Sequence, residues 1–277
     1  MQLSEINIYP IKSLGGVSLT KSTLENRGLQ FDRRWMLVDE KNNFLTQREN
    51  PLMATLKIEI FKNGLGVFSG SERLEIPFET NSQKTVSVKI WSSRCRARGY
   101  EEYFNQWFSN VLRKKCKLVV MPEETQRKVN YFYAIHKNDT VSFADGYPIL
   151  LAGENSLADL NARLETPVPM NRFRPNLVVS GADAFAEDGW KQIKIGAVIF
   201  HVVKPCGRCL ITTIDQTSGE KLGVEPLKTL ATYRIPKRSV NRKILFGQNM
   251  IAENIGEVLN VGDKIEVVET KNKPVFV

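Results

Sequence analysis

The first hundred residues of this 277-residue chain contain a succession of short runs rich in β-branched and alternating apolar residues, each bounded by turn residues. The runs lie at residues 3–14, 32–40, 44–49, 55–61, 65–69, 73–78 and 85–91. Asn63 and Gly64 separate two of them, and Asn-Gly between apolar runs is a strong hairpin signal. Short strands joined by tight turns are typical of barrels and sandwiches. The sequence therefore predicts a β-barrel or sandwich here.

The period of the apolar residues changes at 101–112, where they recur at helical spacing. The basic segment RKKCK follows, at the end of the expected helix where positive charge complements the helix dipole. The polar stretch 121–130 comes next and is the best candidate for a linker, although a surface loop within one domain would look the same. We predict two domains, 1–120 and 121–277.

The second half mixes helices and strands. Residues 155–164, with a polar cap at Asn155 or Ser156, and residues 225–234, with Pro226 at the first helical position, have helical features. The expected strands around them are 176–181, 197–204, 209–215 and 264–270. Because helices and strands do not alternate regularly, a parallel βαβ winding is not predicted. The expected fold class is mainly β with inserted helices (α+β).

The composition indicates a globular protein with a sizeable core, since 42% of the residues are hydrophobic. No apolar run approaches the roughly 20 residues that cross a bilayer, and the start of the chain lacks signal-peptide features. We therefore expect a cytoplasmic protein without membrane contact. The net charge of +9 favours an anionic partner. Charge alone does not separate a phosphate-bearing small molecule from nucleic acid, but no nucleic-acid module is visible, and we expect no nucleic acid.

Two cysteines, Cys206 and Cys209, stand three positions apart in the segment KPCGRCLITTID. A structural zinc site needs four ligands, yet the chain offers only two other cysteines and two histidines, none of them in a second close pair. A redox dithiol belongs at a helix N-terminus, whereas a β-branched run follows here. The remaining alternative from the residues alone is a pair of small packed side chains.

Seven motifs spread along the chain carry a resemblance to a known family. They are IYPIKSLGG (8–16), DRRWMLVDE (32–40), ADGYPILL (144–151), SLADLNARL (156–164), FRPNLVVSG (173–181), CGRCLITTID (206–215) and LFGQN (245–249). In order and spacing the sequence resembles the MOSC proteins, and within them the amidoxime-reducing components and bacterial reductases of N-hydroxylated compounds. The resemblance implies an N-terminal β-barrel-like domain followed by a MOSC β-barrel domain, with a molybdopterin cofactor between them.

The family's metal-ligand position falls on Cys209, which the resemblance makes the thiolate ligand to molybdenum and a catalytic residue. A soft thiolate suits this metal, and the pterin dithiolene supplies two further sulfurs. Cys206 is then a packed thiol. The implied activity is the reduction of hydroxylamines, amidoximes or N-hydroxylated bases. Some bacterial relatives carry a ferredoxin-like domain, and no such cysteine cluster is visible here, so the resemblance implies an external electron-donor protein, a flavin or iron–sulfur reductase.

Basic and polar residues within the motifs are assigned to the cofactor. An ammonium, a hydroxyl and several guanidinium groups can bind phosphate oxygens, and an amide can read the pterin edge. The expected cofactor-binding residues are Lys12, Ser13, Arg33, Arg174, Asn176, Arg208 and Cys209. Arg34, next to Arg33 on an expected strand, should point to the other face.

Asp145 is the acid that we place near the metal, as a catalytic residue that relays protons or hydrogen-bonds the substrate. Its alternative role is that of a turn residue before Gly146. Two functions from other classes stay open for the protein as a whole. One is a carrier that delivers the cofactor, or sulfur destined for it, without turnover. The other is an anion- or RNA-binding β protein.

Overall fold

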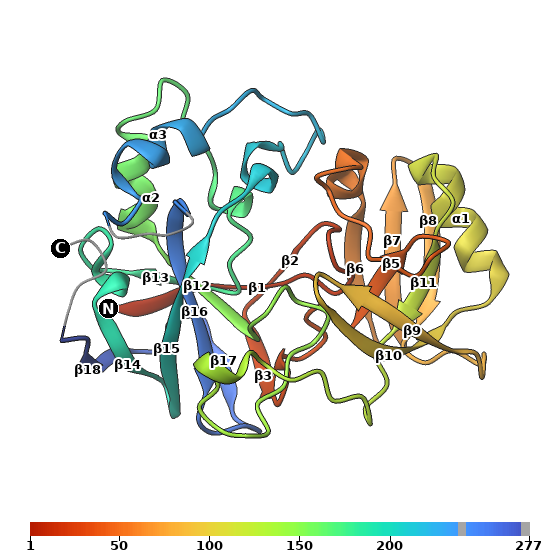
Figure 1. Cartoon of the computed structure of the whole chain (residues 1–277), viewed down its shortest axis with the longest axis horizontal. Coiled ribbons are helices and arrows are strands. Elements are labelled where there is room, and N and C mark those ends of the chain that lie inside the picture. The colour runs from red at the N-terminus through yellow and green to blue at the C-terminus, as the bar shows by residue number, and fades with distance from the viewer. Residues whose placement is uncertain (238–241, 273–277) are drawn as a thin grey trace.

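The computed structural model describes residues 1–237 and 242–272 and shows two β-rich units side by side (Figure 1). The strands are β1 (Gln2–Ile8), β2 (Val17–Leu19), β3 (Lys21–Glu25), β4 (Gly28–Leu29), β5 (Trp35–Val38), β6 (Lys57–Phe61), β7 (Gly64–Ser69), β8 (Glu72–Pro77), β9 (Thr85–Ile90), β10 (Ser93–Gly99), β11 (Lys117–Val120), β12 (Ile149–Gly153), β13 (Leu177–Ser180), β14 (Trp190–Ile195), β15 (Val198–Gly207), β16 (Leu245–Ala252), β17 (Val258–Asn260) and β18 (Ile265–Thr270). The α-helices are α1 (Glu102–Leu112), α2 (Glu154–Asn161) and α3 (Leu227–Tyr233). The expected mainly-β fold class with inserted helices is confirmed.

One unit contains the sheets β5-β11-β10-β9 and β6-β7-β8, with α1 beside them (Figure 1). The predicted hairpin at Asn63 is present, since β6 pairs with β7 and Phe61 lies opposite Gly64. Lys62 and Asn63 are therefore the two turn residues, one position earlier than the Asn-Gly pair indicated. α1 buries Phe108 and Leu112, as its helical spacing predicted.

The other unit is built on an eight-stranded sheet in the order β18-β14-β15-β16-β12-β13-β1-β2. Neighbouring strands of this sheet are antiparallel except for β12 and β13, which are parallel and are joined through α2. One βαβ unit thus occurs where none was predicted. β1 at the N-terminus of the chain pairs with β13, which draws the first residues into this sheet. The division of the chain at residue 120 stays a prediction.

The two units share a continuous apolar interior. The larger core cluster of the eight-stranded sheet includes Ile6, Leu151 and Phe200, all fully buried. Val17, Phe31 and Ile60 pack against this cluster and also against the core of the other unit. Because these contacts join both cores, the surfaces that face each other between the units are held in place by packing.

Four local predictions were wrong. Residues 44–49 form no strand, apart from a single bridge at Phe44, and residues 209–215 contain the 3₁₀ helix Leu210–Thr213 in place of a strand. The N-cap of α2 is Gly153 and not Asn155 or Ser156. The Ser156 hydroxyl is instead buried, donating to Glu187 and accepting from the Phe185 amide. Pro226, expected as the first residue of its helix, is the N-cap of α3.

Candidate functional site

A cavity of about 460 Å³ brings the motif residues together. It is lined from both units, by segments near β1, β5, β9, β12, β13, β15 and β16. All eight residues expected at the site line it: Lys12, Ser13, Arg33, Asp145, Arg174, Asn176, Arg208 and Cys209. Arg34 does not, because its guanidinium forms an ion pair with Glu25 at 2.5 Å, which agrees with the expectation that it points elsewhere.

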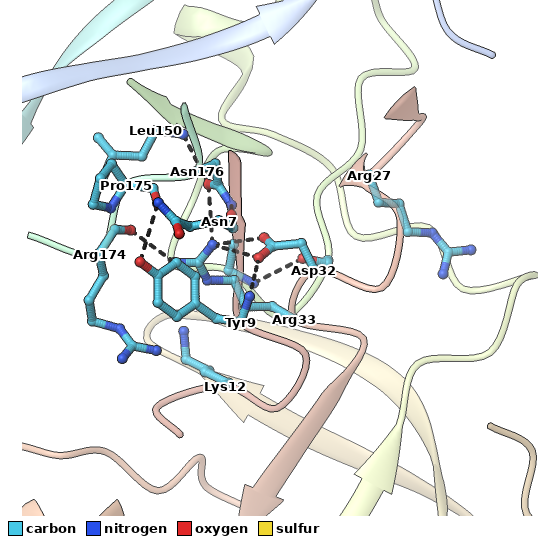
Figure 2. A network of polar contacts seen from close by, with 12 residues as sticks. Asn7, Tyr9, Lys12, Arg27, Asp32, Arg33, Leu150, Arg174, Pro175 and Asn176 are labelled. Carbon is cyan, nitrogen blue, oxygen red and sulfur yellow. Dashed lines mark hydrogen bonds and ion pairs between the residues drawn. The ribbon is translucent and has the colours of Figure 1, made fainter. Parts of the chain in front are cut away.

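A buried polar network anchors one wall of the cavity (Figure 2). Arg33 Nη1 donates to Asp32 Oδ2 at 2.7 Å and to Asn176 Oδ1 at 3.2 Å. Asp32 is fully buried and also accepts from the Tyr9 amide at 2.9 Å. Burial alone would lower the pKa of Arg33, but the Asp32 carboxylate more than offsets this effect and raises it. Arg33 is therefore a fixed positive charge.

The amide of Asn176 is used within the protein. Its Oδ1 accepts from Arg33 and from the Leu150 amide, and its Nδ2 donates to the Asn7 carbonyl at 3.1 Å. Since both ends of the amide already have partners and the residue is only 1% exposed, it orients Arg33. This arrangement argues against the expected contact between the Asn176 amide and a pterin edge.

Arg174 and Lys12 extend into the same space beside Tyr9 (Figure 2). Arg174 donates to the Leu14 carbonyl at 2.7 Å, and its guanidinium lies 4.1 Å from the centroid of the Tyr9 ring. Burial is the main cause that lowers the pKa of Arg174 to about 10, with Arg33 adding like-charge repulsion. Burial likewise lowers the pKa of Lys12 to about 8. Both groups are thus positive charges that lack full stabilisation by the protein.

Asp145 is the acid that faces these cations. Its Oδ1 lies 2.5 Å from Lys12 Nζ, and its side chain is 58% exposed. Partial enclosure of the Asp145 carboxylate by the cavity walls would raise its pKa, but the Lys12 ammonium, a hydrogen bond from Trp91 and the charge of Arg48 hold that pKa well below its usual range. The carboxylate is therefore ionised at neutral pH and acts as an acceptor.

Cys206 and Cys209 lie at the end of β15, and both line the cavity. Each sulfur accepts a hydrogen bond from a different arginine: Arg48 Nη2 lies 3.1 Å from Cys209 Sγ, and Arg208 Nη1 lies 3.0 Å from Cys206 Sγ. The two thiols therefore have different hydrogen-bond donors.

Several residues of the site carried no signal that we used in the sequence. Arg48 and Trp91 line the cavity but lie outside the seven motifs. Arg127, in the expected linker, is buried and donates to the carbonyls of Ser142 at 2.8 Å and Ala144 at 2.6 Å, so it fixes the segment that leads to Asp145. Lys243 adds another basic group to the lining. Arg48, Trp91 and Lys243 line the cavity and Arg127 supports one of its segments, in each case next to residues distant in sequence, and no local pattern reveals this arrangement.

Comparison with known proteins defines the class to which this fold and cavity correspond. Residues 1–115 match the MOSC N-terminal beta barrel domain, and residues 138–266 match the MOSC domain. The chain is 34% identical to mitochondrial amidoxime reducing component 2 of Rattus norvegicus, over 95% of this chain and 82% of that protein. For mitochondrial amidoxime-reducing component 1 of Homo sapiens the identity is 31%, over the same shares of the two chains.

The chain therefore belongs to the MOSC family, and its similarity to the amidoxime-reducing components spans both domains. It is also 33% identical to the molybdenum cofactor sulfurase of Oryza sativa subsp. japonica, over 93% of this chain but only 33% of that longer protein. These relatives show a function related to the molybdenum cofactor. Within the residues that the structure describes, no helix is long and apolar enough to cross a membrane.

The donor set of the cavity fits a phosphate-bearing molybdenum cofactor. Among the described residues that line it, one side chain is acidic, that of Asp145. Six are basic: Lys12, Arg33, Arg48, Arg174, Arg208 and Lys243. The Nε of Arg208 is buried without a hydrogen-bond partner, so this donor could bind an anion in the cavity. Among the described residues, no three His, Cys, Asp or Glu side chains could hold a metal ion together. A metal at Cys209 would thus depend on ligands that a cofactor brings.

Proposed function

We propose that this protein is a molybdenum-cofactor-dependent oxidoreductase that reduces N-hydroxylated compounds with electrons from an external carrier protein. The observation that carries the proposal is the convergence of the Cys209 thiol, which accepts a hydrogen bond from Arg48, with six basic side chains in a single cavity. A soft sulfur suits molybdenum, and the basic groups suit a phosphate. The names of the relatives support an amidoxime or related substrate.

Residues of both units would hold the cofactor. Lys12, Arg174 and Arg208 present cationic donors to a phosphate, with Ser13 beside Lys12, and Arg33 contributes a charge that Asp32 keeps in place. Cys209 would ligate the metal, and Arg48 would orient the thiolate through its 3.1 Å contact. When bound, the cofactor supplies a two-electron redox centre able to accept an oxygen atom.

Reduction of R–NHOH to R–NH₂ and water consumes two electrons and two protons, so the site must deliver protons. Lys12 Nζ is suited to this task because it lines the cavity 2.5 Å from Asp145 and can release a proton and regain one through this pair. Asp145 stays ionised and would hold the ammonium at 2.5 Å or accept a hydrogen bond from the substrate. In this proposal Asp145 is the partner of the proton donor.

The test uses protein purified from a host that makes the molybdenum cofactor. Molybdenum, zinc and pterin are measured, and reduction of an amidoxime and of a hydroxylamine is followed with a chemically reduced viologen as electron donor. We expect about one molybdenum and one pterin per chain, together with turnover. Protein that contains neither would overturn the proposal and favour an anion- or RNA-binding function.

A second candidate is a carrier that delivers the cofactor or its sulfur. It is favoured by the similarity to the molybdenum cofactor sulfurase and by the position of Cys206 in the same cavity. The same experiment separates the two functions, because a carrier would contain molybdenum and pterin without reducing either substrate.

A further inference from the structure

Trp91 occupies an unusual position in the backbone. Ile90 pairs with Ser93 across the β9–β10 hairpin, so Trp91 and Ser92 are the two turn residues. The φ angle of Trp91 is +55°, in the left-handed region. Glycine, asparagine and aspartate are the usual residues at such turn positions, because a side chain with a Cβ is strained there. Strained residues cluster at functional sites, which makes this outlier a candidate for function.

The Trp91 ring is held at the cavity beside the thiol. It lies against the Arg48 guanidinium at 4.7 Å from the ring centroid, and Arg48 in turn donates to Cys209 Sγ at 3.1 Å. An edge contact with Phe44, 5.1 Å between ring centroids, fixes the other side. One residue thus separates the indole from the sulfur that we propose as metal ligand.

Packing does not explain why an indole stands here, and its hydrogen bond to Asp145 uses only the ring nitrogen. Its side chain is 47% exposed, more than those of the other aromatic residues that line the cavity, Phe44, Tyr147 and Phe173. Neighbouring Val88 and Ile90 are fully buried in the core of this unit, whereas Trp91 belongs to none of the core clusters of the described residues. The exposed indole surface is therefore open to a molecule in the cavity.

We infer that Trp91 is a specificity-determining residue whose indole stacks on planar, conjugated N-hydroxylated substrates and so favours them over small aliphatic hydroxylamines. The inference rests on the proposed function. Its physical basis is the π-surface of the indole, which gains from stacking with a flat conjugated group and gains little from a small non-planar one. The Arg48 guanidinium on the same ring keeps the indole oriented.

The kinetic test compares kcat/KM for an aromatic amidoxime, such as benzamidoxime, with kcat/KM for N-methylhydroxylamine. In Trp91→Leu we expect the ratio of the two values to fall by about five- to a hundredfold, the range that corresponds to the loss of one stacking contact. Trp91→Phe, which keeps an aromatic face, should lose much less. Because both substrates depend equally on Cys209 and Asp145, a general effect of the substitution through Arg48 or through the lost hydrogen bond to Asp145 cancels in the ratio, and Trp91→Phe loses the same hydrogen bond.

An unchanged ratio in Trp91→Leu would overturn the inference. Failure of the wild-type protein to reduce either substrate is a different result, since it would contradict the proposed function itself. A binding measurement on cofactor-free protein gives an independent readout. Trp35 and Trp190 are 2% and 4% exposed, and Trp107, which is half-buried on α1, does not line the cavity, so benzamidoxime should quench mainly the fluorescence of Trp91. Quenching should be lost in Trp91→Phe, and quenching that persists there would contradict the inference.

Discussion

Binding of a phosphate in the cavity should depend on the protonation of Lys12. Its pKa of about 8 in the folded protein, compared with 10.5 for a solvated lysine, results mainly from burial, and the Asp145 carboxylate partly offsets that effect. The ammonium is therefore present below pH 8 and is lost as the pH rises through 8. We expect the cofactor-free protein to bind inorganic phosphate more weakly above this pH.

The magnitude follows from the fraction of protein that carries the charge. With a pKa of about 8, roughly half of the molecules are protonated at pH 8 and roughly one tenth at pH 9. If only the protonated form binds, the apparent Kd rises about fivefold over this interval and about tenfold for each further pH unit. Isothermal titration calorimetry between pH 8 and 9 measures this dependence, because this interval lies below the pKa of about 10 of Arg174 and inorganic phosphate is a dianion throughout it.

Two variants determine whether Lys12 is responsible. Lys12→Arg keeps its charge at these pH values and should bind phosphate with little pH dependence. Asp145→Asn removes the carboxylate that raises the pKa of Lys12, so its transition should move to a pH below 8. Lys12→Met, without the charge, should bind weakly at every pH. A pH dependence that is the same in wild type and Lys12→Met would refute the reasoning, because another group would then be titrating.

Three further predictions concern other residues of the site. Cys209→Ser should lose bound molybdenum and turnover, whereas Cys206→Ser should mainly lose 0.5 to 3 kcal/mol of stability, about the usual range for a point mutant; equal losses in metal analysis and assay would contradict a single ligand. Arg33→Ala should destabilise the fold by about 3–5 kcal/mol in urea unfolding, because it leaves the Asp32 carboxylate buried without its ion pair, and a fully stable Arg33→Ala would show that the pair is dispensable. Arg127→Met should cost about 3 kcal/mol or more, since several buried carbonyls lose a charged donor; a change below 1 kcal/mol would contradict that role.

Arg33 illustrates how the structure changes an expectation from sequence. The motif places Arg33 and Arg174 in equivalent roles, and from the sequence alone the alanine variant of either should lower cofactor occupancy with the fold largely intact. In the structure Arg33 compensates a fully buried carboxylate, whereas Arg174 has neutral acceptors. Arg174→Ala is therefore the cleaner probe of cofactor binding, because it leaves no buried charge unpaired.

The local sequence pattern predicted the secondary structure correctly where local packing determines it. The predicted strand 73–78 and the predicted helix 101–112 correspond to β8 and α1. β8 buries its apolar Leu74 and Ile76, and α1 buries Phe108 and Leu112 but leaves Tyr103 exposed. The β-branched run after Cys209 was wrongly predicted to be a strand, because hydrogen bonds from its threonine side chains to nearby carbonyls favour a tight turn over strand pairing. Thr212 Oγ1 donates to the Cys209 carbonyl at 3.0 Å and Thr213 Oγ1 donates to the Leu210 carbonyl at 2.8 Å, and both bonds stabilise the tight turn.

The sequence predicted only those residues of the candidate site that lie within the seven motifs. All eight expected residues line the cavity, yet each lies in a different surrounding that the motif does not describe. Arg127 stands in a polar stretch that reads as a linker, and its burial depends on a contact with residues 142–145. Trp91 follows an ordinary strand, and only the folded hairpin shows its left-handed backbone and its place beside Arg48.

The charges of the cavity also link cofactor binding to stability. The pKa values of Lys12 and Arg174, about 8 and about 10, lie below those of solvated lysine and arginine mainly because of burial. At 1.36 kcal/mol per pH unit, each buried charge costs roughly 3 kcal/mol in the cofactor-free protein. An anion beside these groups removes much of that cost, so part of the binding free energy comes from relief of repulsion and desolvation. The loaded protein should therefore unfold at a higher temperature than the cofactor-free protein, and the difference should shrink in Arg174→Ala, whose folded state no longer contains one of the two costly charges.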